Sequence, residues 1–404
     1  MRVAVVCFDF KLSNIRLQPW RYIYEISKGI TSKNIDLLII SDGSSTSPTE
    51  DNIDGINITR LDTLRSLPFR KNDHLISVIE KYSPDIILWS LNNTSFYFYE
   101  TIKTINKPIV VLWQSTFYDL SYILSLGLSE LIRNFNSLLL YVINSFIPNL
   151  FIKKVLMLPS IKKVITLNEN SKKSLMKYGL LDNDIFVIPP GIHDYDLELP
   201  DMVSVENKKL EIIDKNNFII LYLGSPLSLR GIDTLIEAVS NVKETVPSLQ
   251  LVILSRRRSN NLIKEDDYIK DLCCKKGIQN NTIIISKFLE RNDIKEFIVL
   301  ADVIALPFKI VQSDTPTSIL EVMSLGKTVI STKVDGIPEL LAESRGYLVN
   351  PNDSVALAKS ILYLYSNSSI REKIGVTARE YMLEYPKWDQ ITQNFLKLFE
   401  QIIV

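Results

Sequence analysis

The sequence predicts an α/β protein with two doubly wound domains, each built on a mainly parallel sheet. Short runs of Val, Ile and Leu recur along the 404 residues and alternate with helical stretches. Such near-continuous apolar runs are typical of strands that helices cover on both faces. The length exceeds that of one ordinary core and suits two. The alternation stops over residues 192–216 and then restarts, which indicates a linker.

The first half is expected to form a domain over residues 1–195. Its strands are predicted at Val3–Phe8, Asp36–Ile40, Asp85–Trp89, Ile109–Trp113, Lys163–Leu167 and Asp184–Ile188. Two of its helices are predicted at Trp20–Gly29 and Asn168–Tyr178. The break Pro189-Pro190-Gly191 follows the last of these strands and ends the regular pattern.

The second half is expected to form a domain over residues 196–385. Its strands are predicted at Asn217–Leu223, Leu249–Leu254, Thr282–Ser286, Val303–Leu306 and Thr328–Ser331. Its helices are predicted at Ile232–Lys243, Asp293–Ala301, Ser318–Leu325, Ser354–Ser366 and Ile370–Tyr385. The final helix, over residues 386–404, is expected to pack back on the first domain.

Composition excludes several classes of protein. The 46 Lys and Arg residues balance 46 Asp and Glu residues, whereas a nonspecific nucleic-acid binder needs a basic surplus. Cys7, Cys273 and Cys274 match neither a disulfide framework nor a zinc spacing, so a reducing compartment is expected. The opening MRVAVVCFDF is typical of a buried strand rather than a signal peptide. The chain is therefore expected to be cytoplasmic.

Residues 134–152 carry no charge and leave two interpretations open. A membrane span needs about 20 mainly apolar residues, and the Asn residues and Pro148 argue against one. The segment is then either core helices of the first domain or an apolar surface that dips into a membrane interface. In the second case, four cations are expected to face anionic head groups: Lys153, Lys154, Lys162 and Lys163.

Two apparent motifs carry no chemistry. Gly326-Lys327-Thr328 looks like the end of a phosphate-binding P-loop, but Glu321 stands where the leading glycine belongs. Asp194-Tyr195-Asp196 is more simply a solvated acidic turn than a divalent-ion site. The chain has no G-x-G-x-x-G, and its two histidines are far apart. Neither a metal nor a dinucleotide cofactor is expected.

Three segments of the second half predict a site for an anionic ligand: residues 221–235, residues 313–321, and residues 332–340, a strand end and loop that lead to another helix start. Gly224 directly follows a strand and lets a ligand approach the backbone. Arg230 precedes a helix whose first amides favour negative charge, and its guanidinium matches phosphate oxygens. Thr315 and Pro316 are expected to begin another helix, as N-cap and first residue. Glu321 lies inside that helix among apolar residues, where a ribose diol would satisfy its carboxylate.

Four phrases in order carry a resemblance to a known family: IPPGI (188–192), LGSPLSLRGIDTLIEAV, ADVIALPF and SILEVMSLGKTVISTKVDGIPELL. Together they resemble the retaining glycosyltransferases of family 4, the glycosyl transferases group 1, most strongly over residues 217–345. The resemblance implies the GT-B fold, in which two Rossmann-like domains face each other across a cleft.

The resemblance also implies roles for individual residues. Gly224 would let the donor diphosphate approach, Arg230 would bind that diphosphate, and Glu321 would hold the ribose hydroxyls. The backbone amides of Thr317, Ser318 and Ile319 would meet the phosphates.

The sequence departs from the family pattern at several positions. Ser225 replaces an arginine, and Arg256, Arg257 and Arg258 are candidates for the missing cation. Ser313 stands where the family has its first acid, and Asp314 is a candidate to substitute for it. Asn14 and Arg16 lie in the loop where the family has a glycine pair. Gln114 stands where many relatives have a histidine near the sugar, so it is expected on the acceptor and sugar side.

The resulting hypothesis is a metal-independent hexosyltransferase of glycan biosynthesis that retains anomeric configuration. A UDP-, GDP- or ADP-sugar would be the donor, and a glycan, glycolipid or lipid-linked sugar would be the hydroxyl acceptor. Two alternatives remain: a nucleotide-sugar epimerase or hydrolase of the same fold, and a catalytically weakened protein that binds sugar nucleotides.

Overall fold

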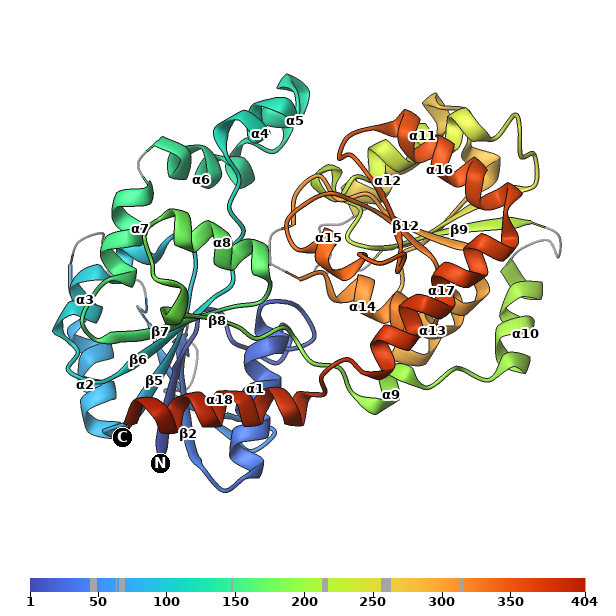
Figure 1. The fold of residues 1–404 in the computed structure, drawn as a ribbon. Coiled ribbons are helices and arrows are strands. Elements are labelled where there is room, and N and C mark those ends of the chain that lie inside the picture. Colours follow the sequence, from blue (N-terminus) through green and yellow to red (C-terminus); the bar gives the residue numbers. More distant parts are fainter. Residues whose placement is uncertain are drawn as a thin grey trace. The chain divides into compact units, whose positions relative to one another are not determined.

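The computed structural model describes residues 1–43, 49–62, 64, 70–146, 148–212, 217–255, 263–311 and 315–403. The chain divides into two compact units (Figure 1). The first unit holds Met1–Gly191 and Pro386–Val404, and the second holds Ile192–Val311 and Pro316–Tyr385. Each unit is built on its own sheet, so the predicted class of two Rossmann-like units with parallel sheets is confirmed.

The first unit contains a sheet whose described strands run in the order β3-β4-β2-β1-β5-β6-β7-β8. Their bounds are β1 Arg2–Val6, β2 Asp36–Asp42, β3 Glu50–Ile53, β4 Ile56–Leu61, β5 Ile86–Leu91, β6 Ile109–Trp113, β7 Ile161–Thr166 and β8 Ile185–Val187. All neighbours pair in parallel except β3 and β4, which pair antiparallel. Asp54 and Gly55 join these two strands, both with positive φ (51° and 85°), as a tight hairpin turn requires.

Helices cover both faces of this sheet. They are α1 Trp20–Ser32, α2 Asp73–Tyr82, α3 Tyr99–Thr104, α4 Leu120–Ser125, α5 Leu128–Arg133, α6 Phe135–Phe146, α7 Pro148–Leu156, α8 Glu169–Lys177 and α18 Trp388–Ile403. Val3 and Val5 face a core shared with α1 and α18, whereas Ala4 and Val6 face a core shared with α2, α3 and α7. This alternation follows from the two-residue repeat of a strand.

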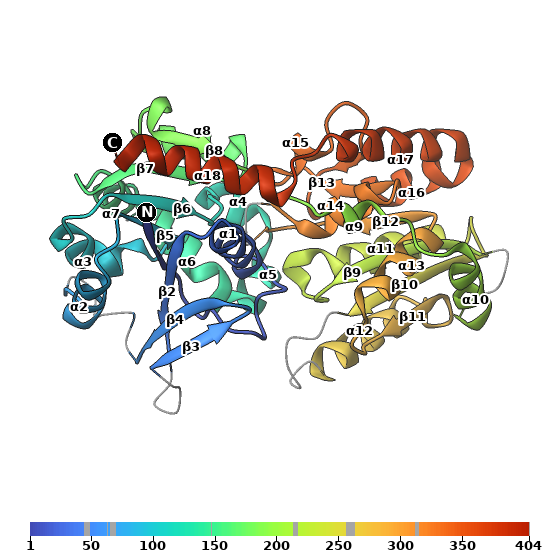
Figure 2. The same cartoon turned by 90° about the horizontal axis from the view of Figure 1, so that it is seen from below.

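The last helix lies alongside α1 (Figures 1 and 2). Phe395 of α18 is fully buried, and its ring centroid is 6.0 Å from that of Tyr22 in α1. Trp388 packs edge-on against the same tyrosine at 5.5 Å. The Tyr22 hydroxyl donates to the carbonyl of Ile188 (2.9 Å). The helix is therefore part of the first unit's core.

The second unit contains a parallel sheet whose described strands run in the order β11-β10-β9-β12-β13-β14. Their bounds are β9 Phe218–Gly224, β10 Leu249–Ser255, β11 Thr282–Ile285, β12 Val303–Leu306, β13 Val329–Thr332 and β14 Tyr347–Val349. Its helices are α9 Asp194–Leu197, α10 Met202–Ile212, α11 Ile232–Val242, α12 Ile263–Lys275, α13 Arg291–Leu300, α14 Thr317–Ser324, α15 Ile337–Leu340, α16 Ser354–Ser366 and α17 Ser368–Leu383.

The predicted linker over residues 192–216 is wrong for its described part. Residues 192–212 form α9 and α10 and belong to the second unit. Lys208 of α10 forms ion pairs with Asp293 (2.7 Å) and Glu296 of α13. These contacts lie more than 80 residues apart in the chain, so the local pattern of the segment does not reveal them.

The described part of the uncharged stretch 134–152 begins just after α5 and forms all of α6 and the first part of α7. Leu138 and Ile152 are buried, in line with the core interpretation, while Phe135 is exposed. Across the part of the chain that the structure describes, no helix is both long and apolar enough to cross a bilayer.

Candidate functional site

The strand order places a switch point in the second unit between β9 and β12. From β9 the chain runs outward through β10 and β11, and it then returns to β12 on the other side. In doubly wound sheets, ligands bind beyond the carboxyl ends of the two strands at such a point. Gly224 ends β9, and the segment after β12 leads toward α14.

Gly224 and Arg230 are in direct contact at this edge. Gly224 has φ +130°, a conformation that L side chains rarely adopt. A Cβ built on it would lie 2.7 Å from Nη2 of Arg230 and 3.1 Å from Cζ. The glycine therefore serves two needs: its backbone conformation and the close approach of the guanidinium.

The guanidinium of Arg230 is held on its other sides by aromatic residues. Its Cζ lies 4.9 Å from the ring centroid of Phe308. Burial raises the pKa of Tyr222, and the charge of the nearby Arg230 acts in the opposite direction on that pKa. Nε of Arg230 is buried without a hydrogen-bond partner among the described residues. The arginine is half-buried and preorganised at the carboxyl end of β9.

An ion pair fixes the next part of the loop. Nζ of Lys309 lies 2.8 Å from Oδ2 of Asp233 in the first turn of α11, and only 1% of the Lys309 side chain is exposed. The backbone amides of Lys309 and Ile310 both donate to the carbonyl of Leu229 (3.0 Å). The segment after β12 is thereby tied to η3 (Ser228–Arg230), the short turn that carries Arg230.

The helix α14 begins at Thr317, one residue after the start that Thr315 as N-cap predicts and one before the predicted element Ser318–Leu325. Its N-cap is Pro316 rather than Thr315, and the Ile319 amide donates to the carbonyl of Pro316 (3.0 Å). Ser318 and Ile319 are buried, while Thr317 is half-buried at the start of the helix. Pro316 itself offers no side-chain hydrogen bond to cap this end. The backbone amides of this first turn are the groups that the resemblance implies for phosphate contact.

The remaining predicted donor residues are placed as follows. Glu321 lies within α14 and is half-buried. Ser225 is half-buried directly after β9, and its carbonyl accepts from the Tyr222 hydroxyl (2.8 Å). Ser313 and Asp314 lie outside the described residues, as do the three arginines at 256–258.

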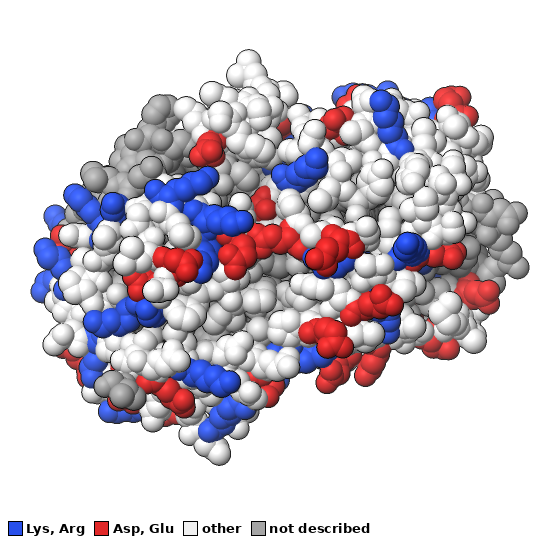
Figure 3. Space-filling model, viewed as in Figure 1, with Lys and Arg blue, Asp and Glu red and all other residues white. Residues whose placement is uncertain are grey.

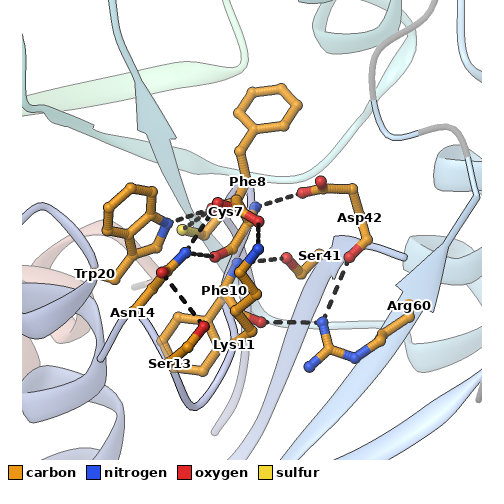
Figure 4. A network of polar contacts seen from close by, with 11 residues as sticks. Cys7, Phe8, Phe10, Lys11, Ser13, Asn14, Trp20, Ser41, Asp42 and Arg60 are labelled. Atoms are coloured by element: carbon orange, nitrogen blue, oxygen red, sulfur yellow. Dashed lines mark hydrogen bonds and ion pairs between the residues drawn. The ribbon is translucent and has the colours of Figure 1, made fainter. Parts of the chain in front are cut away.

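The first unit has its own switch point, between β1 and β5. The loop between β1 and α1 carries a network of polar contacts here (Figure 4). Asn14 Nδ2 donates to the backbone carbonyl (3.0 Å) and to Oδ2 (2.8 Å) of Asp9, while Lys11 pairs with Oδ1 of that residue (2.7 Å). The Asp9 amide in turn donates to Asp42 Oδ1 at the end of β2. Asn14 is therefore a loop-shaping residue in this structure.

Arg60 of β4 closes the network from the other side. Its Nη1 donates to the carbonyls of Phe10 (3.0 Å) and Asp42 (3.4 Å), and its Nη2 lies 2.6 Å from Asp51 Oδ2. The Arg60 guanidinium holds the pKa of the Asp51 carboxyl below its usual 3.8. Arg16, the other residue expected in this loop, is exposed.

Cys7 lies at the base of this loop and is buried. Burial, and then the negative charges of Asp42 and Asp9, raise the pKa of its thiol far above the usual value. Its thiol stays protonated at neutral pH, so Cys7 is unsuited to act as a nucleophile.

Neutral amides and hydroxyls line the carboxyl ends of β5 and β6. Gln114, 5% exposed, accepts from Ser90 Oγ (2.9 Å) and donates to the carbonyl of Pro19 (3.4 Å). Asn93 Nδ2 donates to the carbonyl of Thr116 (3.4 Å), but its Oδ1 is buried without a partner among the described residues. The amide oxygen and nitrogen of Gln18 are also buried without a hydrogen-bond partner among the described residues. This edge therefore holds unused hydrogen-bonding capacity and little charge.

Several of these groups were not predicted from the sequence. Asp9 and Asp42 stand at or just beyond the carboxyl ends of β1 and β2. A carboxylate at the end of a predicted strand is visible in the sequence and could have identified both residues. Lys309 and Asp233 gave no signal, because they are 76 residues apart and meet only in the fold. Among the described residues, no three His, Cys, Asp or Glu side chains are grouped to hold a metal ion.

Comparison with known proteins agrees with this geometry. Residues 204–381 match the family model described as glycosyl transferases group 1, which confirms the resemblance for that part of the chain. The chain is 23% identical over 225 residues to the lipopolysaccharide glucosyltransferase WaaG of Escherichia coli. That match covers 54% of this chain and 57% of the relative.

Two solved structures share the fold over nearly the whole chain. A glycosyltransferase from Rickettsia africae has a TM-score of 0.74 at 19% identity, with 100% of this chain and 98% of that one covered. HepE from Anabaena, solved in complex with UDP and glucose, has a TM-score of 0.68 at 15% identity, with 99% of each chain covered.

Proposed function

From the match of residues 204–381 to the glycosyl transferases group 1, we propose that this chain transfers a hexosyl group from a nucleotide-sugar donor to a hydroxyl acceptor, with retention of configuration. The contact between Gly224 and Arg230 carries the proposal. It presents a fixed guanidinium at the switch point of the sheet in the second unit. The first-turn amides of α14 follow the neighbouring strand β12.

The donor would bind through its diphosphate and its ribose. Arg230 and the amides of Thr317, Ser318 and Ile319 would receive the phosphate oxygens. Glu321 would accept hydrogen bonds from the ribose hydroxyls. Ser313 and Asp314 are proposed to contact the donor sugar. A uridine nucleotide is the first donor to test, since the HepE structure holds UDP.

The reaction would proceed on one face of the sugar. The acceptor hydroxyl attacks the anomeric carbon while the bond to the diphosphate breaks, and the departing diphosphate takes the acceptor's proton. Negative charge grows on the diphosphate in this step, so the preorganised charge of Arg230 and the amide dipoles of α14 would lower the barrier. No bound metal is needed for this scheme.

The acceptor would be recognised by the first unit. Gln114 would face the acceptor and sugar side, with Asn14 and Arg16 in the adjacent loop. The unused groups of Asn93 and Gln18 favour a partner rich in hydroxyls, since each amide both donates and accepts. A glycan or a lipid-linked sugar has this chemistry, and the enzyme would work on the cytoplasmic side of the cell.

The decisive experiment compares Arg230→Ala and Arg230→Lys with wild type in a UDP-sugar turnover assay. Loss of Arg230 should lower kcat about 10²- to 10³-fold while the melting temperature stays near that of wild type. Arg291→Ala is the matched control, because Arg291 also stacks on an aromatic ring (Tyr195, 4.4 Å) but lies on α13, away from the switch point. Turnover near the wild-type level in Arg230→Ala would refute the assignment.

A second candidate is a protein that binds sugar nucleotides with weakened catalysis. Ser225, in place of the arginine implied by the resemblance, favours it. Calorimetry that detects UDP-sugar binding without turnover on any acceptor would support this alternative. Product formed from the donor alone would instead support a hydrolase or epimerase.

A further inference from the structure

The helices α4, α5 and α6 expose apolar side chains in close succession. Leu124, Leu128, Ile132 and Phe135 are 56%, 72%, 71% and 59% exposed. We call these four residues the apolar surface. They fall within twelve residues of sequence, and the three helices contact one another. A concentration of this kind is typical of a surface that meets a partner or a membrane.

Basic residues flank the apolar surface. Residues 120–180 hold eight Lys and Arg but only two Asp and Glu, in a chain whose net charge is zero. We call Lys153, Lys154, Lys173 and Lys177 on α7 and α8 the basic rim. Of the two acids, Glu130 is only 4% exposed and accepts a hydrogen bond from Asn134 (3.0 Å). Figure 3 shows blue side chains over α7 and α8, and an almost entirely white surface over α4 and α5.

Contacts within the first unit hold the basic rim next to the apolar surface. The helices α6 and α7 contact each other. A Cβ built on Gly179, just after α8, would lie 2.9 Å from Nζ of Lys153 on α7. The ring of Tyr178 packs 5.0 Å from that of Phe117, three residues before α4. The two sets of residues thus belong to one continuous region.

Aromatic side chains pack together on and next to the helices that carry the apolar surface. Tyr118 stacks on Tyr122 (5.2 Å) and meets Tyr141 of α6 edge-on (5.3 Å). The hydroxyl groups of Tyr141 and Thr116 are 3.4 Å apart, which ties α6 to the segment directly after β6. The exposed leucines and isoleucine therefore sit on helices whose inner faces are already packed.

We propose that the apolar surface and the basic rim dock the first unit on a bilayer that contains anionic lipids. The apolar side chains would enter the interface while the lysines meet the head groups, and the short helices would lie in the membrane plane rather than cross it. A second copy of the chain fits less well, because a two-fold contact would bring two basic rims together. Anionic head groups complement the rim instead.

Docking in this way would bring the carboxyl ends of β5 and β6, where the acceptor is proposed to bind, close to the lipid. Only five residues, Ser115 to Asp119, separate Gln114 from the start of α4 at Leu120. An acceptor anchored by a lipid would then reach the neutral amide groups near Gln114 without leaving the membrane. This consequence rests on the proposed function, whereas docking itself does not.

The test is co-sedimentation of the full chain with phosphatidylcholine vesicles that contain or lack phosphatidylglycerol, at low and at high salt. We expect binding to the anionic vesicles that salt weakens. The double variant Leu128→Glu/Ile132→Glu should lose it, whereas Val355→Glu/Val376→Glu, made at two sites each 56% exposed in the second unit, should keep it. Lys154→Gln/Lys173→Gln should weaken binding about fivefold per lysine, and Lys359→Gln/Lys373→Gln should not.

Melting curves and UDP-sugar binding separate this proposal from the transferase. A Leu128→Glu/Ile132→Glu variant that melts like wild type and still binds the nucleotide isolates the membrane step. No vesicle binding by wild type at low salt, or equal binding by that variant, would overturn the proposal. So would a wild-type dimer that this variant dissociates, since the apolar surface would then be a contact between copies.

Discussion

The guanidinium of Arg230 occupies the space that a side chain at position 224 would need. A Cβ on Gly224 would lie 2.7 Å from Nη2 and 3.3 Å from Nε of that arginine. Gly224 was expected to let a ligand approach the backbone. It therefore also leaves room for the guanidinium of Arg230, the group proposed to bind that ligand. Any residue larger than glycine must move the arginine, and this couples the backbone of β9 to the donor site.

Gly224→Ala should impair nucleotide binding more than its loss of stability explains. The alanine is strained at φ +130° and pushes the guanidinium away. Strain of this kind costs about 1–3 kcal/mol, and the displaced arginine should raise the Kd for UDP at least about tenfold. Calorimetry and urea unfolding measure the two effects.

Gly55→Ala is the control for this prediction. Gly55 has φ +85°, but a Cβ there would meet nothing within 4 Å. It should lose similar stability and bind UDP like wild type. Equal UDP binding by Gly224→Ala and Gly55→Ala would contradict the coupling of Gly224 to Arg230.

The ion pair between Lys309 and Asp233 should respond unequally to loss of its partners. Lys309 is 1% exposed and Asp233 is 21% exposed. Removing the carboxylate from the buried Lys309 ammonium should therefore cost more free energy than removing the ammonium from the more exposed Asp233 carboxylate. Asp233→Asn should lower the free energy of unfolding by about 3–5 kcal/mol, and Lys309→Met by less. Glu100→Gln, at an exposed pair 4.0 Å from Lys103, should change it by under about 1 kcal/mol. Equal losses in the two buried variants would refute the asymmetry.

Asp51 should contribute stability that acid removes. The Arg60 guanidinium lowers its pKa below 3.8 in the folded chain, so the contribution is complete above the unfolded pKa and disappears as pH falls through the folded value. Asp51→Asn should be less stable than wild type at neutral pH, with the gap closing below about pH 4. Urea unfolding across pH measures this gap.

Asp267→Asn serves as the reference for Asp51. Its carboxylate is 65% exposed and 3.8 Å from Lys270, a geometry worth under about 1 kcal/mol. A gap between wild type and Asp51→Asn that stays constant down to acid pH would show that the carboxylate of Asp51 gains nothing from Arg60.

The three cysteines should differ sharply in reactivity. Burial raises the pKa of Cys7 and of Cys273, whereas Cys274 is exposed. Because the thiolate is the reactive form, alkylation of the folded chain near pH 8 should modify Cys274 quickly and the other two slowly. Mass spectrometry should count one fast adduct, and three after denaturation. Rapid modification of folded Cys7 would show that the β1 loop opens.

Apolar runs made most of the buried sheet predictable. The predicted bounds of Ile109–Trp113, Val303–Leu306 and Ser354–Ser366 coincide with the observed elements. Strands β3 and β4 were not predicted, because β3 is largely polar and the apolar residues of β4 alternate with polar ones instead of forming a continuous run. The Asp54-Gly55 dipeptide between them was a usable hairpin signal.

Long-range contacts set the limit for the rest of the fold. The helix α10 has a weak apolar pattern, and its ion pairs from Lys208 to α13 hold it in place. Its helical structure depends on partners that the local sequence does not contain. The same reason explains the linker that was expected in its place.

The candidate site was predictable where a residue type matches its backbone position. Gly224 and Arg230 were found because a glycine after a strand and an arginine before a helix each have a local meaning. Lys309 was not predicted, since a lysine is rarely buried unless it is paired, and its carboxylate partner lies far away in the sequence. The N-cap of α14 lies one residue after the predicted Thr315, because Pro316 supplies the N-cap carbonyl.

The packing of α18 against α1 has a consequence for how a ribosome would produce this fold. Residues 1–191 emerge first, yet Tyr22 must wait for Trp388 and Phe395 before its ring is covered. The second unit, contained between residues 192 and 385, has all its strands available earlier. The half of the protein that is translated first is therefore the half that is completed last, and the apolar face of α1 stays uncovered until α18 has been synthesised.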